Sequence, residues 1–335
     1  AFKIAFPCAL LTGILEYYDG TDILSLLGTG GAADGRAEIM MESAVWSGFT
    51  FLVGFAVVFR TSIAYARFWD GATSTHQMRA EWFDACSAIC AFCKYSSQEN
   101  ETIMRFQHTL IRLFSLLHAL ALAEIEDGKH ETDMDVEAFK LDLIDINGLD
   151  EDSLLAVKNS DSKVQLAFQW IQQIIVENIS SGVLSIPPPI LSRCFQELAN
   201  GMVQFHEAVK VSTIPFPFPY AQTCDALLIF HWLLTPIINV QWVNSIWWSG
   251  VFSFVQVFIL WSLNSIAVEI ENPFGMDQND LDQACMQLEM NKHLVLLLRP
   301  STMHTPTLSS KAILDMGGTS PALGGGGGGG RSTLR

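Results

Sequence analysis

The sequence predicts an all-α membrane protein in which four helices cross the membrane and a helical block lies outside it. Of the 335 residues, 50% are hydrophobic and only 16% are charged, whereas soluble domains carry about 25% charged residues. Two stretches, 43–59 and 226–268, contain no Asp, Glu, Lys or Arg. Strand patterns, in which apolar and polar residues alternate between Gly-rich turns, are nearly absent.

Composition also excludes several classes of protein. The formal net charge of −16 argues against a nucleic-acid partner, since phosphate binding needs a basic patch. The seven cysteines show no dense spacing, which argues against a disulfide scaffold. The high hydrophobic content argues against disorder over most of the chain.

The first two predicted spans lie in the N-terminal part of the chain. Residues 1–18 form the first, although they carry Lys3 and Glu16 and contain Pro7. Residues 43–69 form the second, because their first part is free of charge and long enough with its flanks to cross a membrane.

The other two spans come from the long charge-free stretch. A crossing helix needs roughly 20 apolar residues, and this stretch is about twice that length, so it predicts spans at 221–240 and 246–270. Trp242, Trp247 and Trp248 cluster around the break between the two spans, and such a cluster is typical of an aromatic belt at the membrane–water boundary.

Residues 70–219, called here the soluble block, are predicted to be helical because apolar residues recur at helical spacing within them. Residues 124–161 hold thirteen acidic and three basic residues. We interpret this acidic run as a solvated face or loop, with a cation-binding or regulatory surface as the alternative. Residues 296–335, which include an unbroken glycine run at 324–330, are predicted to be a flexible tail.

Patterns for enzyme chemistry are missing. The sequence has no Gly-x-Ser-x-Gly, phosphate-binding loop or dinucleotide fingerprint, and we expect no enzymatic activity. Cys86, Cys90 and Cys93 share one helix face and are interpreted as buried small residues, with metal binding as the alternative. His231, inside a span, is interpreted as a hydrogen-bonding residue between helices, with a substrate role as the alternative.

An aromatic stripe marks the second span. Phe51, Phe55 and Phe59 stand at i, i+4 and i+8, so they share one face of the helix. The stripe is either an ordinary packed face or, if several copies surround an axis, a hydrophobic constriction.

Two polar segments come after the apolar parts of predicted spans. Arg60 and the segment 67–70 follow the aromatic stripe, and such charges often only mark the membrane interface. After the last span, Asp277 and Asp280 lie beyond an Asn-Pro-Phe-Gly turn. These two carboxylates could hold a hard cation, or Asp280 could cap the helix that follows.

At these residues the sequence resembles the bestrophins, in the branch found in bacteria and photosynthetic eukaryotes. The resemblance covers the chain from about residue 45 to 295 and rests on five motifs in family order. They are Phe59-Arg-Thr-Ser-Ile-Ala-Tyr-Ala-Arg67-Phe-Trp-Asp-Gly71, Ile186-Pro-Pro-Pro-Ile190, Phe195-Gln-Glu-Leu198, Pro215-Phe-Pro-Phe-Pro-Tyr220, and Glu271-Asn-Pro-Phe-Gly275 with Asn279-Asp-Leu281.

The resemblance implies a homopentameric anion channel with four spans per subunit, one central pore and a channel domain at residues 1–295. It places the pore neck at Phe51, Phe55 and Phe59 and a cytosolic aperture at Ile190. Its implied partners are other copies of the chain, membrane lipid, and chloride or bicarbonate as the permeant ion. The implied location is a membrane, with the chloroplast thylakoid as the candidate.

The resemblance also raises calcium as a cofactor. Animal members bind calcium in a clasp after the last span, whose acidic ligands match Asp277 and Asp280 and whose carbonyl positions match Glu269 and Asn272. This sequence departs from the animal pattern at residues 278 and 279, which are Gln and Asn. Two other functions stay open: a cation channel on the same fold, and a membrane adaptor without a working pore.

Overall fold

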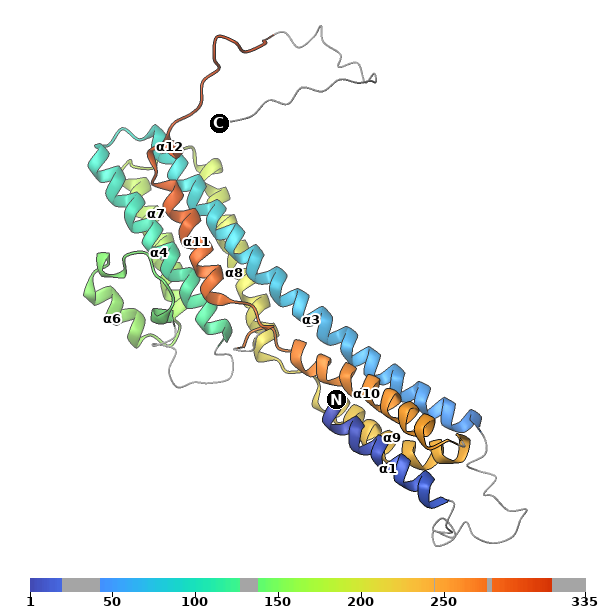
Figure 1. The fold of residues 1–335 in the computed structure, drawn as a ribbon. Coiled ribbons are helices and arrows are strands. Elements are labelled where there is room, and N and C mark those ends of the chain that lie inside the picture. Colours follow the sequence, from blue (N-terminus) through green and yellow to red (C-terminus); the bar gives the residue numbers. More distant parts are fainter. Residues whose placement is uncertain (20–42, 127–137, 244, 276–278, 315–335) are drawn as a thin grey trace.

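The computed structural model describes residues 1–19, 43–126, 138–243, 245–275 and 279–314. Within these ranges all regular structure is helical. The molecule is elongated, with one end built from α1, α9, α10 and the first part of α3, and the other from α4, α6, α7, α8 and α11 (Figure 1). The fold class predicted from the sequence is therefore confirmed for the subunit.

A single helix connects the two ends. Helix α3 (Ser43–Phe92) has 50 residues and is about 75 Å long at a rise of ~1.5 Å per residue. The sequence interpretation ended the span at residue 69, but no Pro lies inside the helix to stop it. Gly71 does not break the helix either. A side chain there would put Cβ 2.9 Å from Pro273 Cγ, so this glycine allows the turn after α10 to approach closely.

The membrane end is a bundle of four helices. Helices α9 (Phe218–Trp242) and α10 (Ile246–Ile270) pack on α3, and α1 (Phe2–Asp19) packs on α10 and α9. Polar contacts tie the helices together inside this apolar bundle. The Thr12 hydroxyl donates to Ser253 Oγ over 2.9 Å, and the Asn239 amide donates to the same oxygen over 2.8 Å.

His231 is buried within this bundle. Its Nε2 lies 3.2 Å from the amide nitrogen of Gln256 in α10, and its ring stacks on Trp46 of α3 with centroids 5.1 Å apart. The interpretation of His231 as a residue that joins helices is confirmed.

By length and composition, four described segments could cross a membrane: Ala44–Tyr95, Asn100–Glu126, Phe218–Val240 and Ile246–Ile270. Three of them contain predicted spans. The remaining one is α4, and 78% of its most apolar segment is buried inside the subunit. The corresponding buried shares are 22% for α3, 44% for α9 and 28% for α10. Helix α4 is therefore the core helix of the soluble block. The crossing of α1, which lies alongside α9 and α10 but falls outside this group, stays a prediction.

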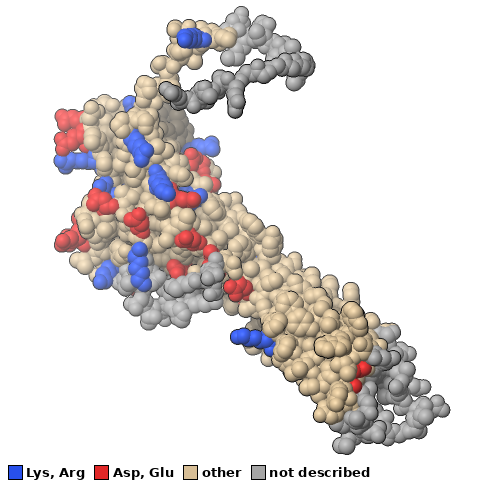
Figure 2. Space-filling view, in the orientation of Figure 1, with Lys and Arg blue, Asp and Glu red and all other residues tan. Residues whose placement is uncertain are grey.

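The soluble block is a helical assembly around α4 (Asn100–Glu126). It contains α6 (Glu151–Asn159), α7 (Lys163–Ser180) and α8 (Pro188–Thr213), with short 3-10 turns at Cys93–Tyr95 and Ile146–Gly148. Helix α11 (Gln283–Leu297) follows the last span yet returns to pack on α4 and α3. Charged residues gather over this end, whereas the membrane end is almost uncharged (Figure 2). Part of the acidic run, 127–137, lies outside the described residues.

The first part of the predicted tail is not structureless. Residue 296 falls in the last turn of α11, and the short helix α12 (Pro300–Met303) follows. The Lys94 ammonium donates to the Thr305 hydroxyl over 2.6 Å, which holds the next segment against the end of α3. Residues 315–335 lie outside the described part of the chain.

Close packing of α8 on α3 leads to the first prediction. A Cβ on Gly201 would lie 2.3 Å from the Trp82 indole, which is fully buried and donates to the Leu198 carbonyl over 3.4 Å. Gly201→Ala is therefore expected to destabilise the protein by about 1–3 kcal/mol, measured as a lower melting temperature of the purified protein. Gly48→Ala is the matched control, because a Cβ there meets nothing within 4 Å. Equal melting of both variants would contradict this account of the contact.

Candidate pore face and its supports

The three phenylalanines form one exposed stripe on α3. Phe51, Phe55 and Phe59 are 70%, 62% and 47% exposed. Neighbouring rings stack along the helix, with centroids 6.5 and 6.3 Å apart. Val53 and Val57, on the other face, are fully buried against α9 and α10. The aliphatic face thus packs inside the subunit, and the aromatic face is left uncovered by it.

The exposed stripe continues beyond the phenylalanines. At steps of three or four residues, further exposed positions follow along the same helix: Ser62, Ala66, Asp70, Thr73, Gln77, Ala80 and Asp84. From Phe51 to Asp84 this surface, called here the α3 stripe, is about 50 Å long at ~1.5 Å per residue. It is aromatic in the membrane end and small or polar in the soluble block. The continuation was not predicted from the sequence, because the predicted span ends at residue 69 and the helical block after it was treated separately.

Ile190 lies at the far end of the soluble block. It is exposed and stands in the first turn of α8, which runs antiparallel to α3. The contact between Trp82 and Leu198 sets the register of the two helices, so Ile190 is level with about residue 90 of α3. Some 30 residues of helix, about 45 Å, therefore separate it from Phe59. The phenylalanines thus lie in the membrane end of the subunit, and Ile190 lies on α8 beyond the last residue of the α3 stripe.

Arg60 is the most deeply buried charged residue beside the stripe, with 3% of its surface exposed. Its guanidinium lies 3.3 Å from Asp225 Oδ1 and 3.4 Å from Glu271 Oε2, and it donates to Asn264 Oδ1 over 2.9 Å. The Asn264 amide in turn donates to Asp225 over 3.1 Å. A buried cation is tolerated only when paired and hydrogen-bonded, so these contacts fix α3 against α9 and α10.

Arg67 binds main-chain oxygens instead of carboxylates. Its Nε donates to the Glu271 carbonyl over 3.1 Å, and its Nη2 donates to the carbonyls of Val211 and Ile214, each over 2.8 Å. The end of α8 and the end of α10 are thereby joined to one side chain of α3. Arg60 and Arg67 were interpreted as markers of the membrane interface, and the structure shows that they also connect four helices. Asn264, one of two amide side chains in the last predicted span, was the sequence signal for this network.

The turn after α10 packs tightly on α3. Phe274 is buried beside Gly71, and the Leu281 amide donates to the Pro273 carbonyl over 3.0 Å. Asp280 also lies inside the turn, because a Cβ on Gly275 would come 2.5 Å from its Oδ2. The alternative in which Asp280 caps the next helix is wrong. Helix α11 begins one residue after Asp282, whose carboxylate accepts from the Cys285 amide over 2.9 Å.

The four residues of the implied calcium clasp are only partly placed. Glu269 is exposed, and the Asn272 amide donates to the Phe274 carbonyl over 3.3 Å. Asp277 lies outside the described residues. Among the residues that the structure does describe, no three His, Cys, Asp or Glu side chains converge to hold a metal ion. Cys86, Cys90 and Cys93 do not form such a group either, and the thiols of Cys86 and Cys93 are buried. The calcium clasp stays a prediction.

Sequence comparisons relate the chain to a known family and to two known proteins. A model of the bacterial and fungal bestrophin family matches residues 26–294. A voltage-dependent anion channel-forming protein of Nostoc sp. is 27% identical over 256 residues, which are 75% of this chain and 76% of that protein. A second one, of Synechocystis sp., is 25% identical over 254 residues, which are 74% of this chain and 76% of that protein.

Solved structures show the same fold. The crystal structure of a bacterial bestrophin homologue from Klebsiella pneumoniae matches with a TM-score of 0.70 and covers 91% of this chain and 98% of that one. The two sequences are 15% identical over this match, so the likeness concerns the arrangement of helices and not the ion or the site residues.

Proposed function

Because the chain belongs to the bacterial and fungal bestrophin family, we propose that five copies surround one central pore and conduct anions across a membrane. In this assembly the α3 stripe of each subunit faces the axis. Phe51, Phe55 and Phe59 form the neck, Ile190 forms the aperture at the other end, and chloride and bicarbonate are the permeant ions.

The observation that carries this proposal is the α3 stripe itself. A large aromatic stripe that its own subunit leaves uncovered needs lipid, a partner or a pore beside it. Lipid contact alone would not explain why the same helix face continues for about 50 Å and becomes small and polar in the soluble block. A pore that is narrow and dry in the membrane, and wide and wet beyond it, requires this change in character.

Phenylalanine rings are compatible with anion passage. The edge of an aromatic ring carries partial positive charge and its face partial negative charge. Five rings that present their edges to the axis tolerate an anion better than a cation. A weakly hydrated anion also sheds water at lower cost, so it crosses a hydrophobic constriction more readily.

One observation favours the second candidate, a cation channel on the same fold. Asp70 and Asp84 are exposed positions on the α3 stripe. In a pentamer each would form a ring of five carboxylates, and acidic rings attract cations. The rings belong to the wide part of the proposed pore, however, and at physiological ionic strength charges are screened over about 8 Å.

Currents and mass test the proposal directly. In a planar bilayer with a steep potassium chloride gradient, the purified protein is expected to show a reversal potential near the chloride equilibrium potential. Replacing chloride by bicarbonate should preserve the current. Native mass measurement in detergent should give five times the subunit mass. A reversal potential near that of potassium would favour the cation channel, and a monomer or dimer would contradict the pentamer.

A further inference from the structure

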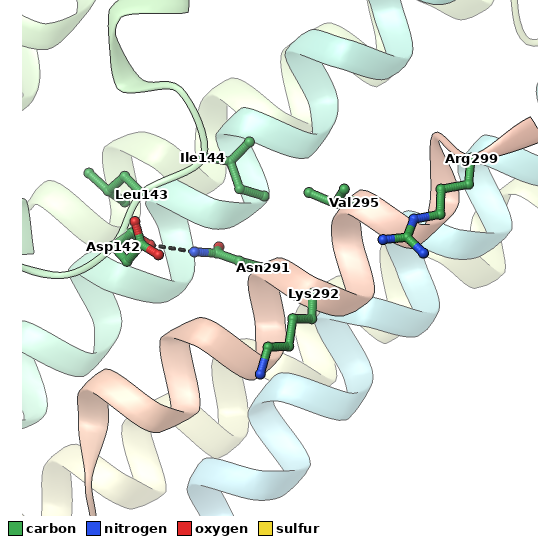
Figure 3. A pocket seen from close by; sticks show the side chains of 7 residues that line it. All are labelled: Asp142, Leu143, Ile144, Asn291, Lys292, Val295 and Arg299. Atoms are coloured by element: carbon green, nitrogen blue, oxygen red, sulfur yellow. Dashed lines mark hydrogen bonds between the residues drawn. The ribbon is translucent and has the colours of Figure 1, made fainter.

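A small cavity lies in the soluble block, away from the α3 stripe. It has a volume of about 310 Å³ and opens between residues 142–144 and α11 (Figure 3). Seven residues line it: Asp142, Leu143, Ile144, Asn291, Lys292, Val295 and Arg299. None of them belongs to α3. The volume is at the lower end of the range for small-molecule sites, which begins near ~300 Å³.

The floor of the cavity is held in place by a buried polar network. Asn291 is 7% exposed, and its Oδ1 accepts from the Ser115 hydroxyl over 2.7 Å and from the Gln287 amide over 3.1 Å. Its Nδ2 donates to the Asp142 carbonyl, as the dashed line in Figure 3 marks. An amide nitrogen carries two N–H groups, so one donor of this fixed side chain remains for a ligand.

Two cations flank this floor. Lys292 and Arg299 are exposed, and within the described chain neither forms an ion pair or a side-chain hydrogen bond. Other cations of the soluble block behave differently, since Arg79 pairs with Glu289 and Arg112 with Asp145. Asp142 adds one carboxylate to the lining, so the two cations leave the cavity a net charge of +1 in a chain with a formal net charge of −16.

We propose that this cavity binds a small organic anion with a phosphate or carboxylate head group. The guanidinium of Arg299 can bind such an oxyanion through two parallel hydrogen bonds, and Lys292 adds a second charge. Asn291 supplies a neutral donor. Leu143, Ile144 and Val295 form the apolar wall for a short organic body.

The position of the cavity makes its ligand a regulator and not a permeant ion. Helix α11 joins the soluble block to the end of α10 through the turn that packs on Gly71. It is also paired with α3, because the Arg79 guanidinium hydrogen-bonds Glu289 and holds the pKa of that carboxyl below its usual range. An anion that draws Lys292 and Arg299 toward residues 142–144 therefore acts on a helix connected to both ends of the molecule.

Calorimetry on the purified full-length channel in detergent tests the proposal. At constant chloride, inorganic phosphate and succinate serve as probes, and neutral succinamide serves as the uncharged comparison. Wild type is expected to bind at least one of the two anions and not succinamide. Lys292→Gln with Arg299→Gln should weaken binding roughly tenfold or more, since both positive charges and the charge-assisted hydrogen bonds of Arg299 are lost.

Three further variants keep the result interpretable. Lys158→Gln with Lys311→Gln removes the same charge from two exposed residues outside the cavity and should bind as wild type does. Val295→Trp keeps both cations but fills the cavity, so it should also abolish binding. Phe51→Ala with Phe55→Ala and Phe59→Ala changes the proposed neck and should leave binding intact.

Binding that is unchanged in the Lys292/Arg299 variant, or lost only in the phenylalanine variant, would overturn the proposal and assign the anion to the pore. The absence of binding to wild type would overturn it too, including the case in which a neighbouring subunit covers the cavity. Each variant is compared with wild type by elution volume and melting temperature, and by its bilayer current. A variant that conducts normally but has lost binding separates this site from the proposed channel function.

Discussion

Removing both carboxylate charges beside Arg60, with Asp225→Asn and Glu271→Gln, is expected to destabilise the subunit by about 3 kcal/mol or more. The reason is that Arg60 is far more deeply buried than the two carboxylates that pair with it. The Arg60 side chain is 4% exposed, whereas those of Asp225 and Glu271 are 52% and 25% exposed. The double variant would leave a buried guanidinium with neutral amide oxygens beside it in place of the two carboxylates. Because Asp225 is half exposed and screened by water, most of the effect should come from Glu271.

The measurement is the melting temperature of the purified channel in detergent, followed by tryptophan fluorescence. Glu269→Gln is the matched control, because it makes the same chemical change two residues earlier on an exposed side chain. Adding Arg60→Met to the double variant should recover much of the loss, since an apolar side chain of similar length removes the uncompensated charge. If the double variant melts like Glu269→Gln, Arg60 is not held by these charges.

Replacing Phe51, Phe55 and Phe59 together by Ala is expected to increase the single-channel current and to weaken any gating. The three rings occupy eight residues of rise, which is a section of about 12 Å. A hydrophobic section of this kind costs an ion much of its hydration and can close by dewetting. Alanine at all three positions makes the section wider and wetter, so the barrier falls.

Assembly should survive in this variant, because the rings are exposed on the subunit and do not belong to its buried core. The matched control is Val53→Ala with Val57→Ala, on the opposite face of the same helix. Both valines are fully buried, so that variant should lower the melting temperature through lost packing without the same rise in current. If the phenylalanine variant falls apart, the stripe is a packing surface. If it conducts unchanged, the neck lies elsewhere, and Ile190 is the next residue to replace.

The role of the acidic residues after the last span cannot be read from their spacing, and Asp280 is an example. A carboxylate three residues from another acid fits a cation ligand or a helix cap equally well. The structure assigns the cap to Asp282 because α11 begins at Gln283, and a start that differs by two residues cannot be read from the pattern of apolar residues.

The sequence by itself determined the helical class, the last two spans and the aromatic stripe. These features follow from local rules: a charge-free stretch must avoid water, and residues four apart share a helix face. Tertiary structure decided the rest. Composition admits α4 as a span as readily as α9, and only the side chains packed around α4 assign it to the soluble block. The partners of Arg60 lie 165 to 211 residues away along the chain. Burial and ion pairing depend on which distant segments meet in space, and no periodicity along the chain specifies that.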